Sequence, residues 1–262
     1  MSVIPIDWPQ AKAAAEQATS DFAGLLRNAP NGDARVPGLA WNVGELGAHL
    51  VTCAMRYTDF AHGEPSTVED DNFDAANADW LRRLTDRDPR ELAEQLAQAS
   101  EAFLKEVEAD DSRMSMSGVP VDKSVAACIL LNELRVHGLD LSRAVGKKGS
   151  ISPSDALLIN YAALNLLPAL VGRAGARDFN ATFEVRFRGG ETVAQRFHDG
   201  TLTITRGAAP SADCRMSVDP TTALLVAYGR IPRWRAALSG KILAWGRKPW
   251  LLLTYQRLLP SV

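Results

Sequence analysis

Cysteine is scarce in this chain, which has only Cys53, Cys128 and Cys214 among its 262 residues. Their odd number and wide spacing exclude a disulfide framework, so we expect reduced thiols and a reducing compartment. The N-terminus lacks a basic region followed by an apolar run, and no uninterrupted apolar run reaches the roughly 18 residues that a membrane span needs. Without a signal peptide or a membrane-spanning segment, we expect a cytoplasmic protein.

An excess of charge of either sign is also missing, since the formal net charge is −2. That balance, together with the lack of a recognisable nucleic-acid-binding motif, argues against a nucleic-acid partner. Hydrophobic residues make up 46% of the chain and charged residues 23%, which is typical of a globular protein. The length exceeds that of one typical domain, so we expect two.

The first part of the chain has the three-and-four spacing of apolar residues that is typical of helices. Asn42 and Glu45 form a capping-box pattern at the start of one of them. Loops rich in Pro, Gly or charge separate the helical segments, including an acidic connection at 69–74 and a break at 117–120. These patterns predict an all-α four-helix bundle over residues 1–147, with helices at 8–28, 41–63, 88–109 and 121–146.

A stretch rich in Gly, Ser, Pro and charge at 147–154 indicates a linker. After it, a helix at 152–175 precedes short β-branched and aromatic runs separated by Gly-Gly, Asp-Gly and Gly-Ala turns. We therefore predict an α+β domain over residues 150–262 with an antiparallel sheet. Its strands are expected at 179–190, 191–200, 201–209, 212–219 and 239–245, and its later helices at 219–230 and 248–259.

Three ionisable side chains lie on one stripe of the helix predicted at 121–146. Glu133, His137 and Asp140 follow one another at spacings of four and three, so they share one face of that helix. A glutamate and a histidine on adjacent turns can bind a divalent metal from one side, and a catalytic site then needs a third protein ligand. His49 is the other histidine that lies mid-helix between apolar neighbours. If it faces the stripe, the two histidines and Glu133 form a metal site in the bundle core.

The remaining histidines suit other places, because His62 ends the second predicted helix and His198 lies in a turn before Asp-Gly. The stripe itself has a second interpretation. A buried histidine is often a satisfied core residue, and a Glu/His pair at a spacing of four can be a plain surface contact. Asp140 can likewise be an aspartate on the helix surface. The spacing alone leaves both interpretations open.

Cys53 lies one helical turn after His49 and on the same face. As a fourth ligand it would close the metal site. We prefer the interpretation that Cys53 is a small buried residue, because free cysteines are often buried. Cys128 and Cys214 receive the same interpretation.

Two segments carry a resemblance to a known family. The sequences WNVGELGAHL, residues 41–50, and ELRVHGLDL, residues 133–141, resemble the signature segments of the mycothiol-dependent maleylpyruvate isomerase family, which is related to the DinB-like bundles. The resemblance implies that Trp41 marks the entry to a helix whose histidine binds metal. It implies that the metal ligands are His49, Glu133 and His137, and that Asp140 matches the aspartate after the second histidine. Residues 216–259 resemble the end of the sterol-carrier-protein-like domain that family members often carry.

The resemblance also implies a cofactor and a chemistry. The metal is expected to be Zn²⁺, and the thiol is expected to be mycothiol, the small thiol of actinobacteria. A thiol arriving at zinc is deprotonated, and the thiolate would add to an electrophilic small molecule. In an isomerase the adduct rotates about a former double bond and expels the thiol, whereas in a transferase the adduct is the product. Asp140, the candidate catalytic residue, could orient a ligand histidine, contact the thiol or handle a proton.

Maleylpyruvate-like substrates are anionic, and an arginine can clamp a carboxylate at two points. In a two-domain enzyme, a pocket at the domain junction could present such an arginine. We expect most of the candidates to be solvated strand residues. They are Arg186, Arg188, Arg196, Arg206 and Arg215.

The C-terminal segment has no acidic residue after Asp219 and combines basic residues with Trp234, Trp245 and Trp250. This pattern is compatible with a surface for an anionic lipid, an acyl group or a membrane. We favour a packed C-terminus with solvated arginines. The alternative to an enzyme is a binding protein that holds an apolar ligand in the sterol-carrier-like domain and uses the metal for structure. We expect a monomer in both cases.

Overall fold

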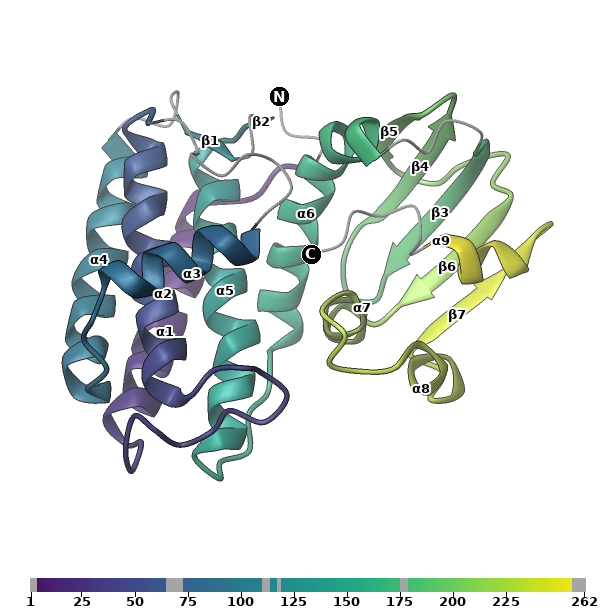
Figure 1. Ribbon diagram of the computed structural model, residues 1–262. Helices are drawn as coiled ribbons and strands as arrows, with labels where there is room; N and C mark the ends of the chain where they lie inside the picture. Colours follow the sequence, from purple (N-terminus) through teal and green to yellow (C-terminus); the bar gives the residue numbers. More distant parts are fainter. Residues whose placement is uncertain (1–3, 65–72, 110–113, 117–118, 175–178, 256–262) are drawn as a thin grey trace. The chain divides into compact units, whose positions relative to one another are not determined.

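The computed structural model describes residues 4–64, 73–109, 114–116, 119–174 and 179–255 (Figure 1). The chain divides into two compact units. One unit is Asp7–Ile151, and the other combines Met1–Ile6 with Ser152–Val262. The N-terminal residues join the second unit through Ile4, whose N–H donates to Asn165 Oδ1 at 3.1 Å and whose carbonyl accepts from Asn165 Nδ2 at 3.0 Å.

The first unit is a helical bundle whose long helices match the four predicted ones within a few residues. Helix α1 packs against α4 and α5, and α2 packs against α4 and α5. Buried apolar side chains, such as Phe22 on α1 and Phe103 on α4, fill the space between them. The bounds of the four helices are α1 (Trp8–Arg27), α2 (Val43–Ala61), α4 (Pro89–Ala109) and α5 (Lys123–Ala144).

Side-chain caps fix where α2 and α5 begin. Asn42 Oδ1 accepts from the N–H of Glu45 at 2.8 Å, and Glu45 Oε2 accepts from the N–H of Asn42 at 2.9 Å, which confirms the predicted capping box. At the start of α5, Asp122 Oδ1 accepts from the N–H of Val125 at 2.9 Å. Each cap satisfies a backbone donor that would otherwise lack a partner. The starts of α2 and α5 are therefore defined by local sequence.

The first turn of α2 packs closely on the segment before α4. A Cβ at Gly44 would lie 2.7 Å from the carbonyl oxygen of Arg87, and one at Gly47 would lie 3.1 Å from Leu92 Cδ1. At position 44, only glycine leaves room for the backbone of Arg87. The N-terminal half of α2 is thereby held against its neighbours.

Helix α3 (Phe73–Arg83) was not predicted and overlaps the expected acidic connection, of which residues 69–72 lie outside the described part. The helix is only 11 residues long and begins within the acidic stretch that we interpreted as a connection. Tertiary contacts also hold it, because Arg56 of α2 donates to Asn77 at 3.0 Å and lies 5.9 Å from the ring of Trp80.

The predicted break before α5 contains a small sheet. Strands β1 (Ser115–Met116) and β2 (Val119–Pro120) pair antiparallel, and residues 117–118 lie outside the described part.

The second unit contains a five-stranded sheet and several helices. Helix α6 (Pro153–Ala174) precedes the sheet as predicted, and α7 (Pro220–Ala227) begins after Asp219, whose side chain accepts from the N–H of Thr222 at 2.8 Å. Helix α8 (Arg233–Leu238) was not predicted.

The predicted C-terminal helix begins as the 3₁₀ turn η1 (Pro249–Leu251) and continues as α9 (Leu252–Tyr255). Residues 256–259 of its predicted span lie outside the described part. The strands are β3 (Ala181–Phe187), β4 (Thr192–His198), β5 (Thr201–Arg206), β6 (Cys214–Val218) and β7 (Ile242–Trp245).

The sheet is mixed, so the prediction of an antiparallel sheet was wrong in one pairing. Its strand order is β5-β4-β3-β6-β7, and β3 pairs parallel with β6 while the other three pairings are antiparallel. Strands β3, β4 and β5 form the expected meander. The chain then crosses to the far side of β3 instead of continuing beside β5. Alternating side chains define the two faces of a strand but not its neighbour, so the sequence pattern did not reveal this crossover.

One face of the sheet forms the core of the second unit. Phe183, Val193, Phe197 and Met216 point into a buried cluster that also contains Leu164 of α6. Helices α6 and α7 lie on one side of the sheet (Figure 1). The opposite face carries alternate residues that are polar or charged, as expected for a sheet with one solvated side.

Helix α6 is the one described helix long and apolar enough, over Pro153–Val171, to cross a membrane by length and composition. Helix α6 packs against β5 and α7. The core helix of a globular domain can have the same length and apolar composition.

Candidate metal centre

The site that the sequence predicted comes together between α2 and α5. His49 of α2 and His137 of α5 each place Nε2 3.6 Å from the same oxygen, Oε2 of Glu133. The two imidazole centroids are 5.2 Å apart, with the rings nearly perpendicular at 84°. His49 is buried, whereas Glu133 and His137 are partly exposed. Both imidazoles thus approach one carboxylate oxygen, whereas the ligand atoms that all lie within 4.8 Å of one another belong to His49, Cys53 and Glu133.

These distances suit a metal ion better than direct hydrogen bonds. A separation of 3.6 Å is long for an N–H···O bond. Nitrogen and oxygen ligands that lie about 2.1 Å from a tetrahedral ion are about 3.4 Å from one another. The donor set of two imidazoles and one carboxylate also matches known catalytic zinc sites. The residues present fit a divalent metal.

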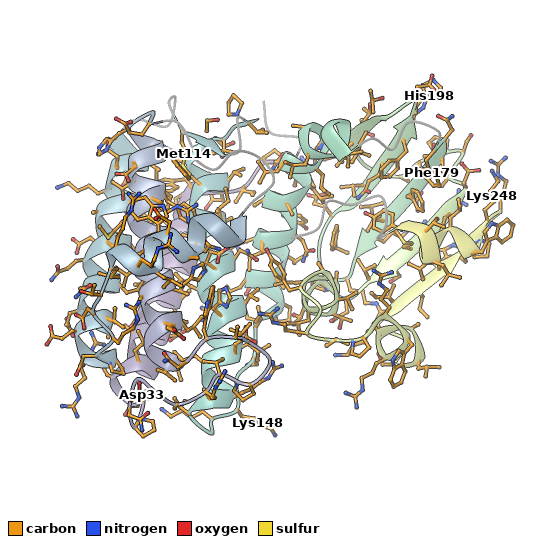
Figure 2. The ribbon with its side chains drawn as sticks, viewed as in Figure 1. Asp33, Met114, Lys148, Phe179, His198 and Lys248 are labelled. Atoms are coloured by element: carbon orange, nitrogen blue, oxygen red, sulfur yellow. The ribbon has the colours of Figure 1, made fainter. Side chains whose placement is uncertain are left out.

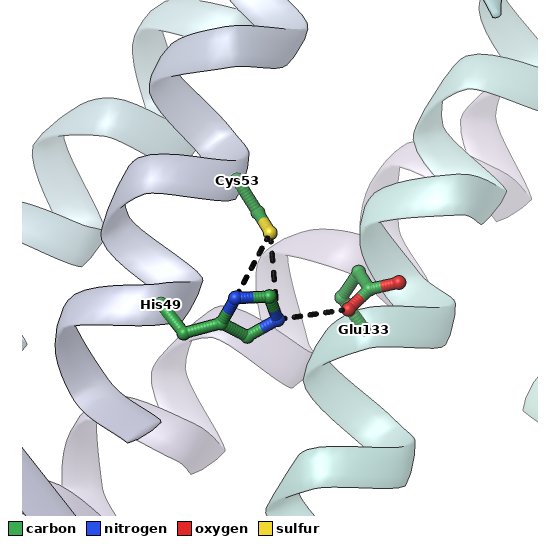
Figure 3. A group of neighbouring side chains, drawn as sticks. All are labelled: His49, Cys53 and Glu133. Carbon is green, nitrogen blue, oxygen red and sulfur yellow. Dashed lines mark hydrogen bonds and ion pairs between the residues drawn. The ribbon is translucent and has the colours of Figure 1, made fainter. Parts of the chain in front are cut away.

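Cys53 reaches the same place from α2 (Figure 3). Its Sγ lies 3.6 Å from His49 Nε2 and 3.8 Å from His49 Nδ1, and the ligand atoms of His49, Cys53 and Glu133 all lie within 4.8 Å of one another. Cys53 is buried as expected, but it is also within reach of the metal position, which its burial alone did not indicate.

Trp41 borders the two histidines. Its ring centroid is 4.6 Å from that of His49 and 6.1 Å from that of His137. Trp41 directly precedes the cap of α2, and its carbonyl accepts from the N–H of Val36 at 3.1 Å. The capping box and this turn therefore fix the indole beside the candidate metal position.

Asp140 is 1% exposed and faces the other side of the His137 ring. Its Oδ2 lies 3.5 Å from His137 Nδ1, and its Oδ1 lies 3.3 Å from Arg143 Nη1. A carboxylate beside Nδ1 favours the tautomer that carries its proton there and leaves Nε2 free as a ligand. This burial excludes the interpretation of Asp140 as a surface aspartate.

Arg56 belongs to the surroundings of the site, and sequence reasoning missed it. It lies three residues after Cys53 on α2, is 7% exposed, and donates to Asn77 at 3.0 Å. Arg56 lies seven residues after His49, so both residues are on the same stripe of α2. This spacing is the sequence signal that could have identified Arg56. Arg56 adds positive charge close to Glu133 and Cys53.

The surroundings shift two pKa values in opposite directions. Burial raises the pKa of Glu133, but the polar contact with His49 and the charges of His137, His49 and Arg56 outweigh it and lower the pKa below its usual value. Burial raises the pKa of the Cys53 thiol far above its usual value, and the nearby Glu133 carboxylate raises it further. Glu133 is thus kept anionic, which favours a cation between the helices.

The other predicted candidates lie elsewhere. His62 caps the C-terminus of α2 and lies 3.2 Å from Glu106 on the surface, and His198 contacts Asn180 at 2.9 Å. Both histidines are exposed, as the sequence indicated.

Four of the five candidate arginines contact partners within the second unit. Arg186 and Arg215 lie 2.6 Å and 3.7 Å from the buried Glu184, and Arg206 lies 2.6 Å from Glu191. Arg188 donates to Ser217 at 3.2 Å and to a backbone carbonyl at 2.6 Å. Arg196 is exposed. These arginines mainly serve the outer face of the sheet.

Comparisons with known proteins show the family and the fold of this chain. The profile of the mycothiol maleylpyruvate isomerase N-terminal domain matches residues 13–142, which contain every residue of the candidate site. A crystal structure of the mycothiol-dependent maleylpyruvate isomerase is similar to this chain, with a TM-score of 0.55, 16% identity, and coverage of 91% of this chain and 93% of that one. A variant of that enzyme with one histidine replaced by alanine gives a TM-score of 0.54 at 15% identity, with the same coverage. At these identities the likeness concerns the fold. No curated protein matches this chain.

Proposed function

Because residues 13–142 make this chain a member of the mycothiol maleylpyruvate isomerase N-terminal domain family, we propose that the protein is a metal- and mycothiol-dependent enzyme that acts on an electrophilic small molecule. The observation that carries the proposal is the convergence of two imidazole Nε2 atoms on one oxygen of Glu133, each at 3.6 Å. The related crystal structure has the same fold and is a mycothiol-dependent isomerase.

His49, Glu133 and His137 would hold the metal, most simply Zn²⁺. When bound, the metal supplies Lewis acidity that favours the thiolate form of a thiol, which is the nucleophilic form. Glu133 contributes the negative charge of the ligand set. Asp140 holds the His137 ring by its Nδ1 side and so keeps Nε2 directed at Glu133. Trp41 excludes water from the edges of both histidine rings.

The implied reaction begins when the thiolate sulfur of mycothiol forms a bond with one carbon of an activated C=C. The π electrons of that bond move into the conjugated carbonyl. In a cis-trans isomerisation, the substrate then rotates about the new single bond, the C–S bond breaks, and its electrons restore the C=C. In an S-transfer, the carbon accepts a proton and the adduct is released. The same residues serve both outcomes.

A test of this function measures metal content and mycothiol-dependent turnover of a maleylpyruvate-type substrate in the same samples. We expect His49→Ala to lose the bound metal and the thiol-dependent reaction. His62→Ala is the matched control, since His62 ends the same helix on the surface, and it should keep both. If His49→Ala retains its metal and its turnover, the proposed enzyme site is wrong.

A second candidate function rests on Cys53. With Sγ 3.6 Å from His49 Nε2, it could act as a fourth ligand and close the site, and a closed site serves structure. The protein would then bind an apolar ligand through its second unit, as a sterol-carrier-like domain. Cys53→Ala separates the two functions. A catalytic site should keep its metal and its turnover in this variant, whereas a structural site should lose metal affinity and stability together.

A further inference from the structure

Large hydrophobic side chains are exposed almost solely in one segment of the described chain. Seven such residues are exposed, and six of them lie between residues 234 and 253. Trp234 is 64% exposed and Leu238 82%. Single exposed hydrophobic residues are ordinary, but a cluster of them marks a surface that binds something. The six are Trp234, Leu238, Leu243, Trp245, Trp250 and Leu253.

Four of these residues come from α8 and β7, which contact each other, and we call Trp234, Leu238, Leu243 and Trp245 the C-terminal apolar surface. Trp250 and Leu253 lie apart from it, because η1 and α9 pack on the core face of the sheet, whereas Leu243 and Trp245 lie on the opposite face. Trp234 and Leu238 are one turn apart on α8, whereas Leu243 and Trp245 alternate along β7, the edge strand of the sheet. Figure 2 labels Lys248, which lies in the segment between β7 and η1. The expectation that the C-terminal tryptophans are packed is therefore wrong for Trp234 and Trp250, which are mainly exposed.

Positive charge surrounds the C-terminal apolar surface. The sequence has no Asp or Glu after Asp219. Arg233, Arg235 and Lys241 are exposed, and within the described residues none of them has an ion-pair partner. By contrast, Arg247 and Lys248 both pair with Asp213, at 2.5 Å and 3.2 Å. The unpaired cations thus belong to α8 and the turn after it, beside Trp234 and Leu238.

We propose that the C-terminal apolar surface docks the protein on the surface of an anionic phospholipid bilayer. Tryptophan favours the boundary between headgroups and acyl chains, and exposed arginine and lysine pair with anionic headgroups. The lack of acidic residues removes the repulsion that such a surface would otherwise meet. Along α8, Arg233 and Arg235 flank Trp234, so cationic and apolar side chains lie side by side. The elements are too short to span a bilayer, so the contact is peripheral.

The test is co-sedimentation of the whole protein with vesicles of phosphatidylcholine alone and of phosphatidylcholine with about one-third phosphatidylglycerol, at low and high salt. We expect binding to the anionic vesicles only, a blue shift of tryptophan emission, and loss of binding at high salt, because salt screens surface charge. Each exposed cation near an anionic surface contributes about fivefold to binding. Arg233→Gln with Arg235→Gln should therefore weaken binding roughly 25-fold.

The apolar part has its own variants. Trp234→Ala with Trp245→Ala should abolish the emission shift and weaken binding at least about tenfold. Met55→Ser is the matched control, because Met55 is an exposed hydrophobic residue outside the C-terminal apolar surface, and it should bind like the parent. Circular dichroism verifies that each variant is folded. Failure to bind anionic vesicles overturns the proposal, as does equal binding to both vesicle types. It is also overturned if gel filtration shows a dimer that the two tryptophan substitutions dissociate, since the surface would then bind a second copy.

Discussion

Glu133 links the two halves of the candidate metal centre, because one of its oxygens lies 3.6 Å from Nε2 of both His49 and His137. Glu133→Gln keeps the size of the side chain and removes its charge. We expect it to lower metal affinity by roughly 100-fold or more, since a ligand is replaced by a neutral amide. Competition with a chelator measures the affinity. Glu106→Gln, which affects only the surface contact with His62, should leave it unchanged.

Asp140 acts on the site through His137, 3.5 Å from its Nδ1. Asp140→Asn should reduce metal affinity by about 10- to 100-fold, because the ring loses the carboxylate that sets its tautomer and orientation. The same chelator competition detects this, with Asp21→Asn as a control that breaks the ion pair with Arg135, away from the candidate metal centre, and leaves Oδ1 to accept from Gln17. An unchanged affinity in Asp140→Asn would show that Asp140 does not orient the ring.

Helical spacing predicts which residues share one face of a helix but not how close their side chains come to one another. His49, Glu133 and His137 could be placed on facing stripes from the sequence, because the 3.6-residue period defines a helix face. The approach of Cys53 to His49 depends on side-chain rotamers, which spacing does not report. Arg56 was missed because a charged residue at the end of a stripe is ordinarily solvated, whereas contacts with α3 bury this one.

At the scale of elements, the start of α2 controls the placement of Trp41. Asn42→Ala removes the side chain that accepts from the N–H of Glu45. We expect a loss of about 1 kcal/mol in the free energy of unfolding. We also expect weaker metal binding, because Trp41 directly precedes the cap and borders both histidines. Urea unfolding and chelator competition on the same variant measure the two effects. A stability loss with unchanged metal affinity would separate Trp41 from the site.

The elements that the sequence predicted best are those with strong local signals. The capping box of α2 and the Asp219-Pro220 start of α7 were both found from local residues. Helix α3 was missed because it is short and begins within an acidic stretch that is typical of a loop, and because its contacts with Arg56 are tertiary. The parallel pairing of β3 with β6 was missed because alternation along a strand carries no information on which strand lies beside it.

At the scale of the whole molecule, Asp213 links the stability of the second unit to pH. Burial raises the pKa of Asp213, but the N–H of Thr182 and the side chains of Arg247 and Lys248 outweigh it and lower the pKa below its usual value. The folded state therefore favours the ionised carboxylate. Its contribution to stability is present above the pKa of the unfolded chain, about 3.8, and is lost as pH falls through the lower folded value.

Asp213→Asn should thus be less stable than the parent protein at neutral pH and converge with it in acid. Urea unfolding at several pH values between about 2 and 7 provides the comparison. Glu191→Gln, which breaks the exposed ion pair with Arg206, is the control and should lose little at any pH. A constant difference between Asp213→Asn and the parent at all pH values would contradict the ionised state of Asp213.

X-ray absorption spectroscopy of the zinc-loaded protein tests the central claim most directly, because it reports the atoms bound to the metal. The account predicts one zinc per chain with two imidazole nitrogens and a carboxylate oxygen at about 2.0–2.2 Å, and the loss of the imidazole signal when His49 and His137 are both replaced by alanine. A sulfur ligand at about 2.3 Å would favour the closed, structural site with Cys53. A zinc environment unchanged by the two histidine substitutions would contradict the candidate metal centre.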